Sequence, residues 1–246
     1  MHAIECSEVW GGIAEADQDL CSVGVTASLF SNASQGGKGG DIYYMSVCSF
    51  GRLTRVAMAD VCGHGEAVSS VSSWLYESIS AYANSTDDNE VLVHLNRLAH
   101  ERGLKALATA SVVSFYVADS MLRFANAGHP PVLMHRAGER EWRKVELQSP
   151  SEPGNLPLGV LNDMTYDMEG IPLGSGDKIL IYTDGVLEAM DKDGEQFGEE
   201  RLCKVLNSCD ERQPDQVKRD VVSALRTHTG GPLNHDDVTI MVLQVR

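Results

Sequence analysis

The sequence lacks any long run of apolar residues. Although 43% of the chain is hydrophobic, no stretch approaches the roughly 20 uninterrupted apolar residues that a membrane-spanning helix needs. The first residues, MHAIECSEVWGG, contain no basic region followed by an apolar segment and so do not resemble a signal peptide. No low-complexity tract suggests disorder. We therefore expect a soluble, cytoplasmic protein with no membrane partner.

The sequence motifs of several covalent nucleophiles and metal sites are also missing. The 6 cysteines form no CxxC pair and have no spaced histidine partners of the zinc-finger kind. No CxxxxxR loop is present to hold a phosphate over a thiolate, and no GxSxG elbow presents a serine. Without a secretory signal, the thiols are expected to be reduced.

Positive charge is scarce. The chain has 20 Lys and Arg against 35 Asp and Glu, a net charge of -15. Nucleic acid is therefore excluded as an expected partner, because its recognition depends on cationic side chains that neutralise backbone phosphates. The acidic excess suits a protein whose carboxylates hold hard cations. It suits equally well an acidic surface that only confers solubility.

Hydrophobic periodicity predicts strands and helices in grouped runs. Strand-like alternation covers 20–30, 42–50 and 53–61, the last two joined by a turn at 50–52. Apolar residues recur at helical spacing over 68–82 and again from Asp88, a plausible cap, to 98. Further strands are expected at 107–117, 122–125, 130–135, 178–183 and 238–245, helices at 199–206 and 216–225, and a surface loop at 148–158.

This order of elements favours antiparallel sheets covered by helices, an α+β fold, over alternating βαβ units. No internal repeat and no separating linker is visible. We expect one domain over residues 1–246, with 1–19 forming a short N-terminal extension or a first edge strand.

Acidic residues stand where predicted strands end or turns begin: Asp41, Asp60, Asp184, Asp236 and Asp237. A rigid sheet can present such side chains into a cleft. Mg²⁺ and Mn²⁺ prefer oxygen ligands and need only a few carboxylates from the protein. Two such ions can activate a water and hold a phosphoryl group. Each aspartate alone is equally compatible with a turn or a helix cap.

The neighbours of these aspartates make the sequence recognisable. Eight segments occur in this order: GGDIYY (39–44), ADVCGHG (59–65), ATA (108–110), NAGHPP (126–131), PLGV (157–160), GDKILIYTDGVLEA (176–189), FGEERL (197–202) and HDDVTIMVL (235–243). Together they resemble the PPM-type metal-dependent serine/threonine protein phosphatases, in the SpoIIE-like (RsbU-like) bacterial branch. The resemblance runs from about residue 20 to the C-terminus.

The resemblance implies a four-layer αββα sandwich of two antiparallel sheets flanked by helices, with a metal centre at one end. Carried over motif by motif, Asp60 bridges two Mn²⁺ or Mg²⁺ ions, with the Val61 carbonyl as a further ligand. Asp184 and Asp236 hold one ion and Asp41 the other, and a third ion would bind weakly. Asp237 is implied as a partner of the ligands, with a ligand role left open.

The family hydrolyses its substrate with a metal-activated water and forms no phosphoenzyme, so Asp60 and Asp184 are the implied catalytic carboxylates. His64 is a candidate general acid for the leaving serine oxygen, or only a packed turn residue. Asn126 and His129 are expected to brace the NAGHPP turn by hydrogen bonds. Cys62 is interpreted as a small residue where relatives often carry serine, rather than as a reactive thiol.

Two departures from the family pattern bear on activity. Relatives usually carry a second aspartate in GGDxYD, and here that place is Tyr44. If the missing aspartate were a ligand, one ion would bind weakly. In addition, no arginine is clearly aimed at the cleft to grip the substrate phosphate. Arg52 and Arg55 lie on the neighbouring hairpin.

Three functions remain open at this point. The leading one is a phosphatase for phosphoserine or phosphothreonine on a protein such as an anti-sigma-factor antagonist. The alternatives are an inactive phosphatase-like binding module, which Tyr44 motivates, and a two-metal phosphoesterase for small molecules. Most relatives carry an N-terminal sensor domain, for which about twenty residues leave no room. We therefore expect regulation by a separate protein, by metal supply or by formation of a homodimer.

Overall fold

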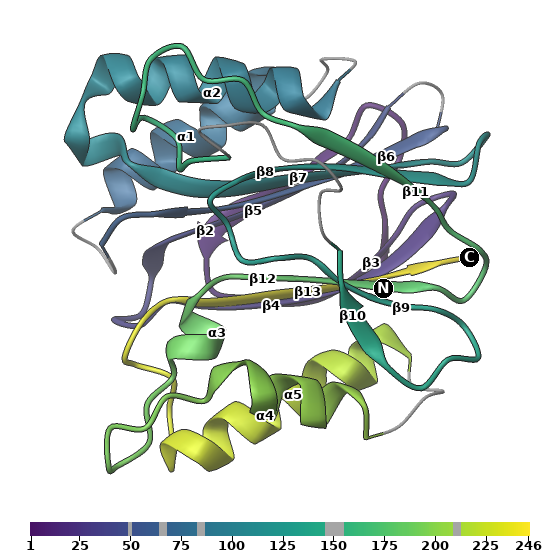
Figure 1. Cartoon of the computed structure of the whole chain (residues 1–246), viewed down its shortest axis with the longest axis vertical. Helices are drawn as coiled ribbons and strands as arrows, with labels where there is room; N and C mark the ends of the chain where they lie inside the picture. Colours follow the sequence, from purple (N-terminus) through teal and green to yellow (C-terminus); the bar gives the residue numbers. More distant parts are fainter. Residues whose placement is uncertain (49–50, 64–67, 83–86, 146–154, 209–212) are drawn as a thin grey trace.

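The computed structural model describes residues 1–48, 51–63, 68–82, 87–145, 155–208 and 213–246 (Figure 1). Two β-sheets lie face to face at the centre, and helices cover both outer faces. The predicted α+β fold, a four-layer αββα sandwich, is therefore confirmed. Among the described residues, no helix is both long and apolar enough to cross a membrane.

The first sheet is 7-stranded, in the order β1-β3-β4-β13-β12-β9-β10. Its neighbouring strands are antiparallel except for β1 and β3, which run parallel and so depart from the purely antiparallel sheet that we expected. Its strands are β1 (His2–Ala3), β3 (Ala16–Cys21), β4 (Val25–Asn32), β9 (Leu133–His135), β10 (Trp142–Lys144), β12 (Lys178–Tyr182) and β13 (Val238–Val245).

The second sheet is 6-stranded, in the order β11-β8-β7-β6-β5-β2, and all its pairings are antiparallel. Because β6 pairs antiparallel with both β5 and β7, the end of β6 lies beside the starts of these two strands at one end of the sheet. The strands are β2 (Val9–Ala14), β5 (Lys38–Cys48), β6 (Leu53–Val61), β7 (Ala108–Tyr116), β8 (Met121–Ala127) and β11 (Met168–Pro172).

Helices form the two outer layers (Figure 1). On the second sheet lie α1 (Ser69–Tyr82) and α2 (Asp88–Arg102), followed by the short 3-10 helix η2 (Leu104–Ala106). On the first sheet lie α3 (Gly185–Glu188), α4 (Gly198–Leu206) and α5 (Pro214–Thr229). Each long helix turns an apolar stripe towards its sheet, and a third apolar layer fills the space between the sheets.

The side chains of strand β5 alternate between two of these apolar layers. Tyr43 and Met45 enter the core between the sheets, whereas Ile42 and Tyr44 enter the layer beneath α1 and α2. Successive side chains of a strand point to opposite faces. Asp41 therefore faces the space between the sheets, on the side opposite to Tyr44.

One local prediction needs correction, one matches the second of its two alternatives, and two fall partly outside the described residues. The single strand expected at 20–30 is two strands, β3 and β4, separated by a turn in which the Ser22 N–H donates to the Val25 carbonyl and the Val25 N–H donates to Ser22 Oγ. Of the two alternatives for residues 1–19, the structure has edge strands: β1 and β2 lie at the edges of different sheets, and β3 pairs with β4. Phe50 of the expected turn at 50–52 and most of the loop at 148–158 lie outside the described residues.

Asp88 does not cap α2, although the helix begins there. The N-cap position is Asp87, and the Asp88 carboxylate turns inwards instead. Its Oδ1 accepts hydrogen bonds from Arg55 Nε at 3.0 Å and from Ser114 Oγ at 2.5 Å. Arg55 and Asp88 are both fully buried, so this ion pair ties the start of α2 to strands β6 and β7.

Candidate active site

Asp41 and Asp60 lie directly opposite each other where β5 begins and β6 ends. Asp41 is buried, and its Oδ2 accepts a hydrogen bond from Thr183 Oγ1 at 2.8 Å. Thr183 follows β12 in the other sheet, and Thr239 of β13 also donates a side-chain hydrogen bond to Asp41. The Asp41 carboxylate is thus held between the two sheets, at one end of the sandwich.

Asp184, Asp236 and Asp237 come from the first sheet at the same end of the sandwich. Asp184 follows Thr183 after β12, and the other two directly precede β13. A Cβ at Gly185 would lie 2.0 Å from the carbonyl oxygen of Asp237. Gly185 is therefore required for the close approach of these two segments, and its φ is not in the left-handed region that an Asp-Gly turn predicts.

The charges of these carboxylates act on one another. Burial, followed by repulsion from Asp41, Asp184, Asp236 and Asp237, raises the pKa of Asp60 to about 10. Burial and the charges of Asp237 and Asp184 likewise raise the pKa of Asp41, to about 8, against the hydrogen bonds from the two threonines. In the described part of the chain, no Lys or Arg forms an ion pair with Asp41, Asp60 or Asp184. The cluster therefore carries a charge that a bound cation would neutralise.

Gly40 leaves room for oxygen atoms to converge beside Asp60. A Cβ at this position would lie 3.0 Å from the Gly63 carbonyl, 3.1 Å from the Val61 carbonyl and 3.3 Å from Asp60 Oδ1. Three oxygen atoms thus surround a point that is free only because residue 40 has no side chain. Carbonyl and carboxylate oxygens are the ligands that Mg²⁺ and Mn²⁺ prefer, so these residues fit such an ion.

Asp237 is held by the backbone rather than aimed into this space. Its Oδ1 accepts the Ser34 backbone N–H at 2.7 Å and its Oδ2 accepts that of Gly40 at 2.5 Å. The aspartate therefore fixes the start of β5. Within the described residues, no group of three or more His, Cys, Asp or Glu side chains already stands in a complete metal-binding geometry.

Asn126 and His129 make the hydrogen bonds that we expected of them. Asn126 Nδ2 donates to the His129 carbonyl and Asn126 Oδ1 accepts the His129 N–H, both at 2.9 Å. His129 Nδ1 lies 2.8 Å from the hydroxyl of Thr109, which is the β7 partner of Asp60. Burial lowers the pKa of His129 to about 3, so its ring is neutral at physiological pH.

The other candidates near the centre divide into described and undescribed residues. His64 lies outside the described residues, so its expected role as a general acid stays a prediction. Cys62 is exposed, and partial burial of its thiol with the charges of Asp60 and Asp184 raises its pKa. This environment disfavours the thiolate and agrees with its interpretation as a small filler residue. His235 Nε2 lies 3.0 Å from the Gly185 carbonyl.

The two departures from the family pattern lie away from the acidic cluster. Tyr44 is fully buried on the helix-covered face of β5, where its hydroxyl is near Ser46 and Arg55. Its side chain therefore takes no place beside Asp41. Arg55 is committed to Asp88, and Arg52 stands at the opposite end of β6, so neither arginine points into the cluster.

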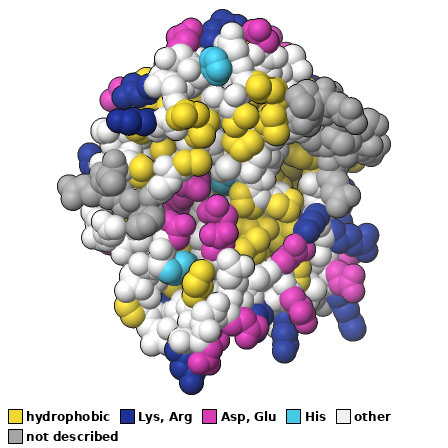
Figure 2. All heavy atoms as spheres, turned by 60° about the vertical axis from the view of Figure 1, so that its left-hand side comes forward, with side chains coloured by type: hydrophobic (Ala, Val, Ile, Leu, Met, Phe, Trp, Pro, Cys, Tyr) yellow, Lys and Arg dark blue, Asp and Glu magenta, His cyan; other side chains and the backbone are white. Residues whose placement is uncertain are grey.

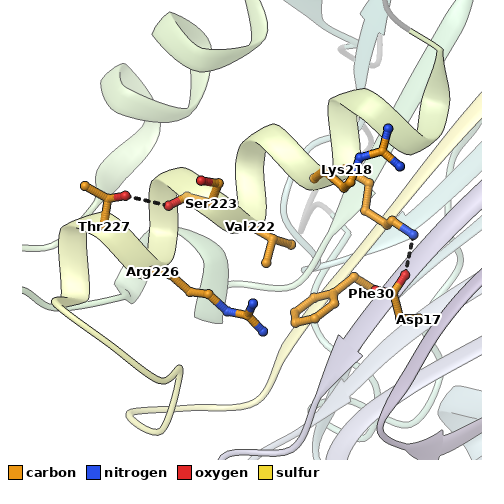
Figure 3. A pocket seen from close by; sticks show the side chains of 8 residues that line it. Asp17, Phe30, Lys218, Val222, Ser223, Arg226 and Thr227 are labelled. Carbon is orange, nitrogen blue, oxygen red and sulfur yellow. Dashed lines mark hydrogen bonds and ion pairs between the residues drawn. The ribbon is translucent and has the colours of Figure 1, made fainter.

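A cavity of about 560 Å³ lies elsewhere, between α5 and strands β3 and β4 (Figure 3). Lys218, which is buried, pairs there with Asp17 and Asp19, and the Arg226 guanidinium lies 5.8 Å from the centre of the Phe30 ring. None of the five acidic candidates lines this cavity. Figure 2 turns forward the side on which α3 follows Asp184 in Figure 1, and acidic side chains gather near the middle of that face.

Sequence reasoning missed the residues that hold the cluster in place. Thr183 and Thr239 orient Asp41, and Gly40 frees the space in front of Asp60. Thr183 and Gly40 stand next to singled-out aspartates, which is the only signal that could have drawn attention to them. Thr239, two residues after Asp237 on β13, gives no such signal.

Comparisons with known proteins identify similar sequences. The family model described as Stage II sporulation protein E (SpoIIE) matches residues 51–246. Phosphoserine phosphatase RsbU of Bacillus subtilis is 25% identical over 201 residues, which are 77% of this chain and 55% of RsbU. The chain thus spans about half the length of that relative.

Solved structures share the fold. The RsbU and RsbW domains of Rv1364c from Mycobacterium tuberculosis match with a TM-score of 0.76 at 24% identity, over 96% of this chain and 61% of that one. RsbX in complex with magnesium matches with a TM-score of 0.69 at 17% identity, over 94% of this chain and 100% of that one.

Proposed function

Because this chain belongs to the SpoIIE family of PPM-type phosphatases, we propose that it hydrolyses phosphoserine or phosphothreonine esters on a protein with the help of two Mg²⁺ or Mn²⁺ ions. RsbU, which it resembles, is a phosphoserine phosphatase. RsbX, which shares its fold, binds magnesium. Both likenesses support the proposal.

The observation that carries the proposal is the meeting of five carboxylates from two sheets. The charges of the other four carboxylates raise the pKa of Asp60. In the described residues, no Lys or Arg forms an ion pair with Asp41, Asp60 or Asp184. Burying like charges together is costly unless cations neutralise them. A fold that needed these residues only as turns would have no reason to bring them together.

In this proposal Asp60 would hold both ions, with the Val61 carbonyl as a further ligand, Asp184 and Asp236 would hold one of them, and Asp41 would hold the other. When bound, the ions would lower the pKa of a water and hold the phosphoryl oxygens for in-line attack. A third, weakly held ion remains part of the proposal.

The surrounding residues fix these ligands. Thr183 orients Asp41, and Asp237 holds the backbone of Gly40 so that the space before Asp60 stays open. His129, kept neutral by burial, hydrogen-bonds the hydroxyl of Thr109 beside Asp60 and adds no charge to the cluster. His64 is proposed to protonate the leaving serine oxygen.

The sequence argument for an inactive binding module does not hold in this structure. It rested on Tyr44 as a lost ligand, but this side chain packs beneath the helices, on the face of β5 opposite to Asp41. We propose a phosphorylated regulatory protein, such as an anti-sigma-factor antagonist, as the substrate and the cytoplasm as the place of action. Regulation through a homodimer is part of the same proposal.

Hydrolysis of an aryl phosphate tests the assignment directly. We expect turnover that requires Mn²⁺ or Mg²⁺, stops in excess chelator and resists thiol alkylation. Asp184→Asn removes one ligand charge and is expected to lower kcat at least about 100-fold. Asp119→Asn, on the exposed turn between β7 and β8, is the matched control and should keep full activity.

Two outcomes would contradict the proposal. Unchanged turnover in Asp184→Asn, or activity that persists in excess chelator, would show that the acidic cluster is not the catalytic centre. Tight metal binding without any turnover would favour the binding module instead.

A further inference from the structure

Three exposed aliphatic side chains lie on two segments at the C-terminal end of α2: η2, which follows this helix, and the loop whose Gly159 carbonyl lies beside His100. Leu104 of η2 is 83% exposed, and Val160 and Leu161 of the loop before β11 are 41% and 46% exposed. We call these three residues the apolar rim. Exposed aliphatic residues are ordinary when scattered, but a group of them beside a catalytic centre marks a contact surface.

The loop that carries Val160 and Leu161 is held firmly by α2. Asn96, which is fully buried, accepts the backbone N–H of Gly159 at 2.9 Å and donates to the carbonyls of Leu161 and Asn162, each at 2.9 Å. One buried side chain thus makes three hydrogen bonds to this short loop. These bonds fix the loop while the side chains of Val160 and Leu161 stay exposed to solvent.

Glycine at position 159 completes this attachment. Gly159 has a φ of +86°, a backbone angle that residues other than glycine rarely adopt. A Cβ at this position would lie 3.3 Å from atoms of both Ala99 and Leu107. Its carbonyl lies 3.2 Å from Nδ1 of His100 on α2. The loop therefore rests closely against the end of α2, immediately before η2 and Leu104.

Backbone pairings connect the two segments of the apolar rim to the end of β6, which carries Asp60. The backbone N–H of Cys62 donates to the carbonyl of Leu107 at 2.9 Å. Leu158 forms a bridge with Ala108, which pairs in turn with Val61 of β6. Val160 is two residues from this bridge and Leu104 is three residues from Leu107. Figure 2 shows hydrophobic side chains directly above the acidic ones on this face.

We propose that the apolar rim is the docking surface for the protein substrate and binds aliphatic side chains that flank its phosphoserine. The inference rests on the proposed phosphatase function. A phosphoserine that enters the acidic cluster must bring its flanking residues over the neighbouring surface, which here is aliphatic and held in place. Preorganised apolar contacts of this kind supply affinity without ordering a loop.

Two synthetic phosphoserine peptides test this surface. They are identical except that leucines on both sides of the phosphoserine in one are glutamines in the other. Wild-type protein should hydrolyse the leucine peptide with a kcat/KM about tenfold higher, expressed mainly in KM. The triple variant Leu104→Asn, Val160→Asn, Leu161→Asn should lose this preference, and Leu104→Asn alone should lose part of it.

The controls separate docking from chemistry. Aryl phosphate, which has no flanking residues, should be hydrolysed equally by the wild type and the variants, which also shows that the variants are folded. Val23→Asn, at an exposed site near Gly51 at the opposite end of the sandwich, should keep the peptide preference. Equal kcat/KM for the two wild-type peptides, or a preference that survives in Leu104→Asn and the triple variant, would overturn the docking surface. Absence of aryl phosphate turnover in the wild type would instead contradict the phosphatase function itself.

Discussion

Single residues decide whether the acidic cluster can accept a cation, and Gly40 shows this most directly. Three oxygen atoms approach the position of its missing Cβ, two of them backbone carbonyls that cannot rotate away. Gly40 also donates its N–H to Asp237, so the same residue links the strand start to the cluster. The role of Gly40 is to leave space, since its φ is not in the left-handed region.

Gly40→Ala is expected to weaken metal binding. The new methyl group would push against the Val61 carbonyl and Asp60 and so displace two proposed ligands. We expect the affinity for Mn²⁺ to fall about tenfold or more, as happens when residues that orient ligands are changed. The Mn²⁺ concentration that gives half-maximal aryl phosphate turnover measures this change.

The matched control is Gly231→Ala, where an added Cβ meets no atom within 4 Å and φ is not in the left-handed region. It should leave the Mn²⁺ dependence unaltered. An unaltered Mn²⁺ dependence in Gly40→Ala would show that the space before Asp60 does not hold the ion.

The sequence indicated the acidic residues of the site but not what holds them. Asp41, Asp60, Asp184 and the pair at 236–237 stand in motifs at strand ends, and these motifs were visible without a structure. The hydrogen bond from Thr183 to Asp41 joins residues 142 positions apart and depends on how the two sheets meet. Contacts of this kind follow from packing between sheets, which residue spacing does not encode.

At the scale of secondary-structure elements, the buried Arg55–Asp88 pair fixes α2 on the second sheet. The helix has no side-chain cap hydrogen bond, so this pair and the apolar stripe of α2 hold its first turn. Burial raises the pKa of Asp88 in spite of the opposing charge of Arg55. Removing either partner would leave an uncompensated buried charge.

Arg55→Met is therefore expected to lower the free energy of unfolding by about 3 kcal/mol or more. The measurement is urea denaturation of the metal-free protein. Adding Asp88→Leu to this variant removes the orphaned carboxylate and should restore most of the loss. If the double variant were no more stable than Arg55→Met, burial of an unpaired charge would not explain the loss.

Sequence periodicity predicted whole elements well where their apolar pattern is regular. Helical periodicity placed α1, α2 and α5 correctly to within a few residues, because each has a regular apolar stripe. It misjudged Asp88, because an aspartate at a helix start is equally typical of a cap. Strand periodicity missed β11, since this edge strand buries little: its side chains are only exposed or half-buried.

For the molecule as a whole, the acidic cluster links stability to pH and to metal. The folded protein raises the pKa of Asp41 and Asp60 above their values in the unfolded chain. Between the unfolded pKa of 3.8 and the folded values of about 8 and about 10, the native state keeps protons that the unfolded state releases. The free energy of unfolding therefore falls as pH rises through this range. His129 acts in the opposite sense, because its pKa is lowered, but its effect is confined to pH values below its unfolded pKa of about 6.5.

A comparison at about pH 7 and about pH 8.5 thus excludes the contribution of His129 and covers the range in which the buried carboxylates keep their protons. The metal-free protein should melt at a lower temperature at the higher pH. Saturating Mn²⁺ should raise the melting temperature at both values and more strongly at the higher one, because cations bind the deprotonated ligands. Asp60→Asn removes the charge at the centre of the cluster. It should flatten the pH dependence of the metal-free protein and abolish most of the Mn²⁺ effect. A wild-type melting temperature that rises with pH in excess chelator would mean that the carboxylates repel one another too weakly to recruit a cation.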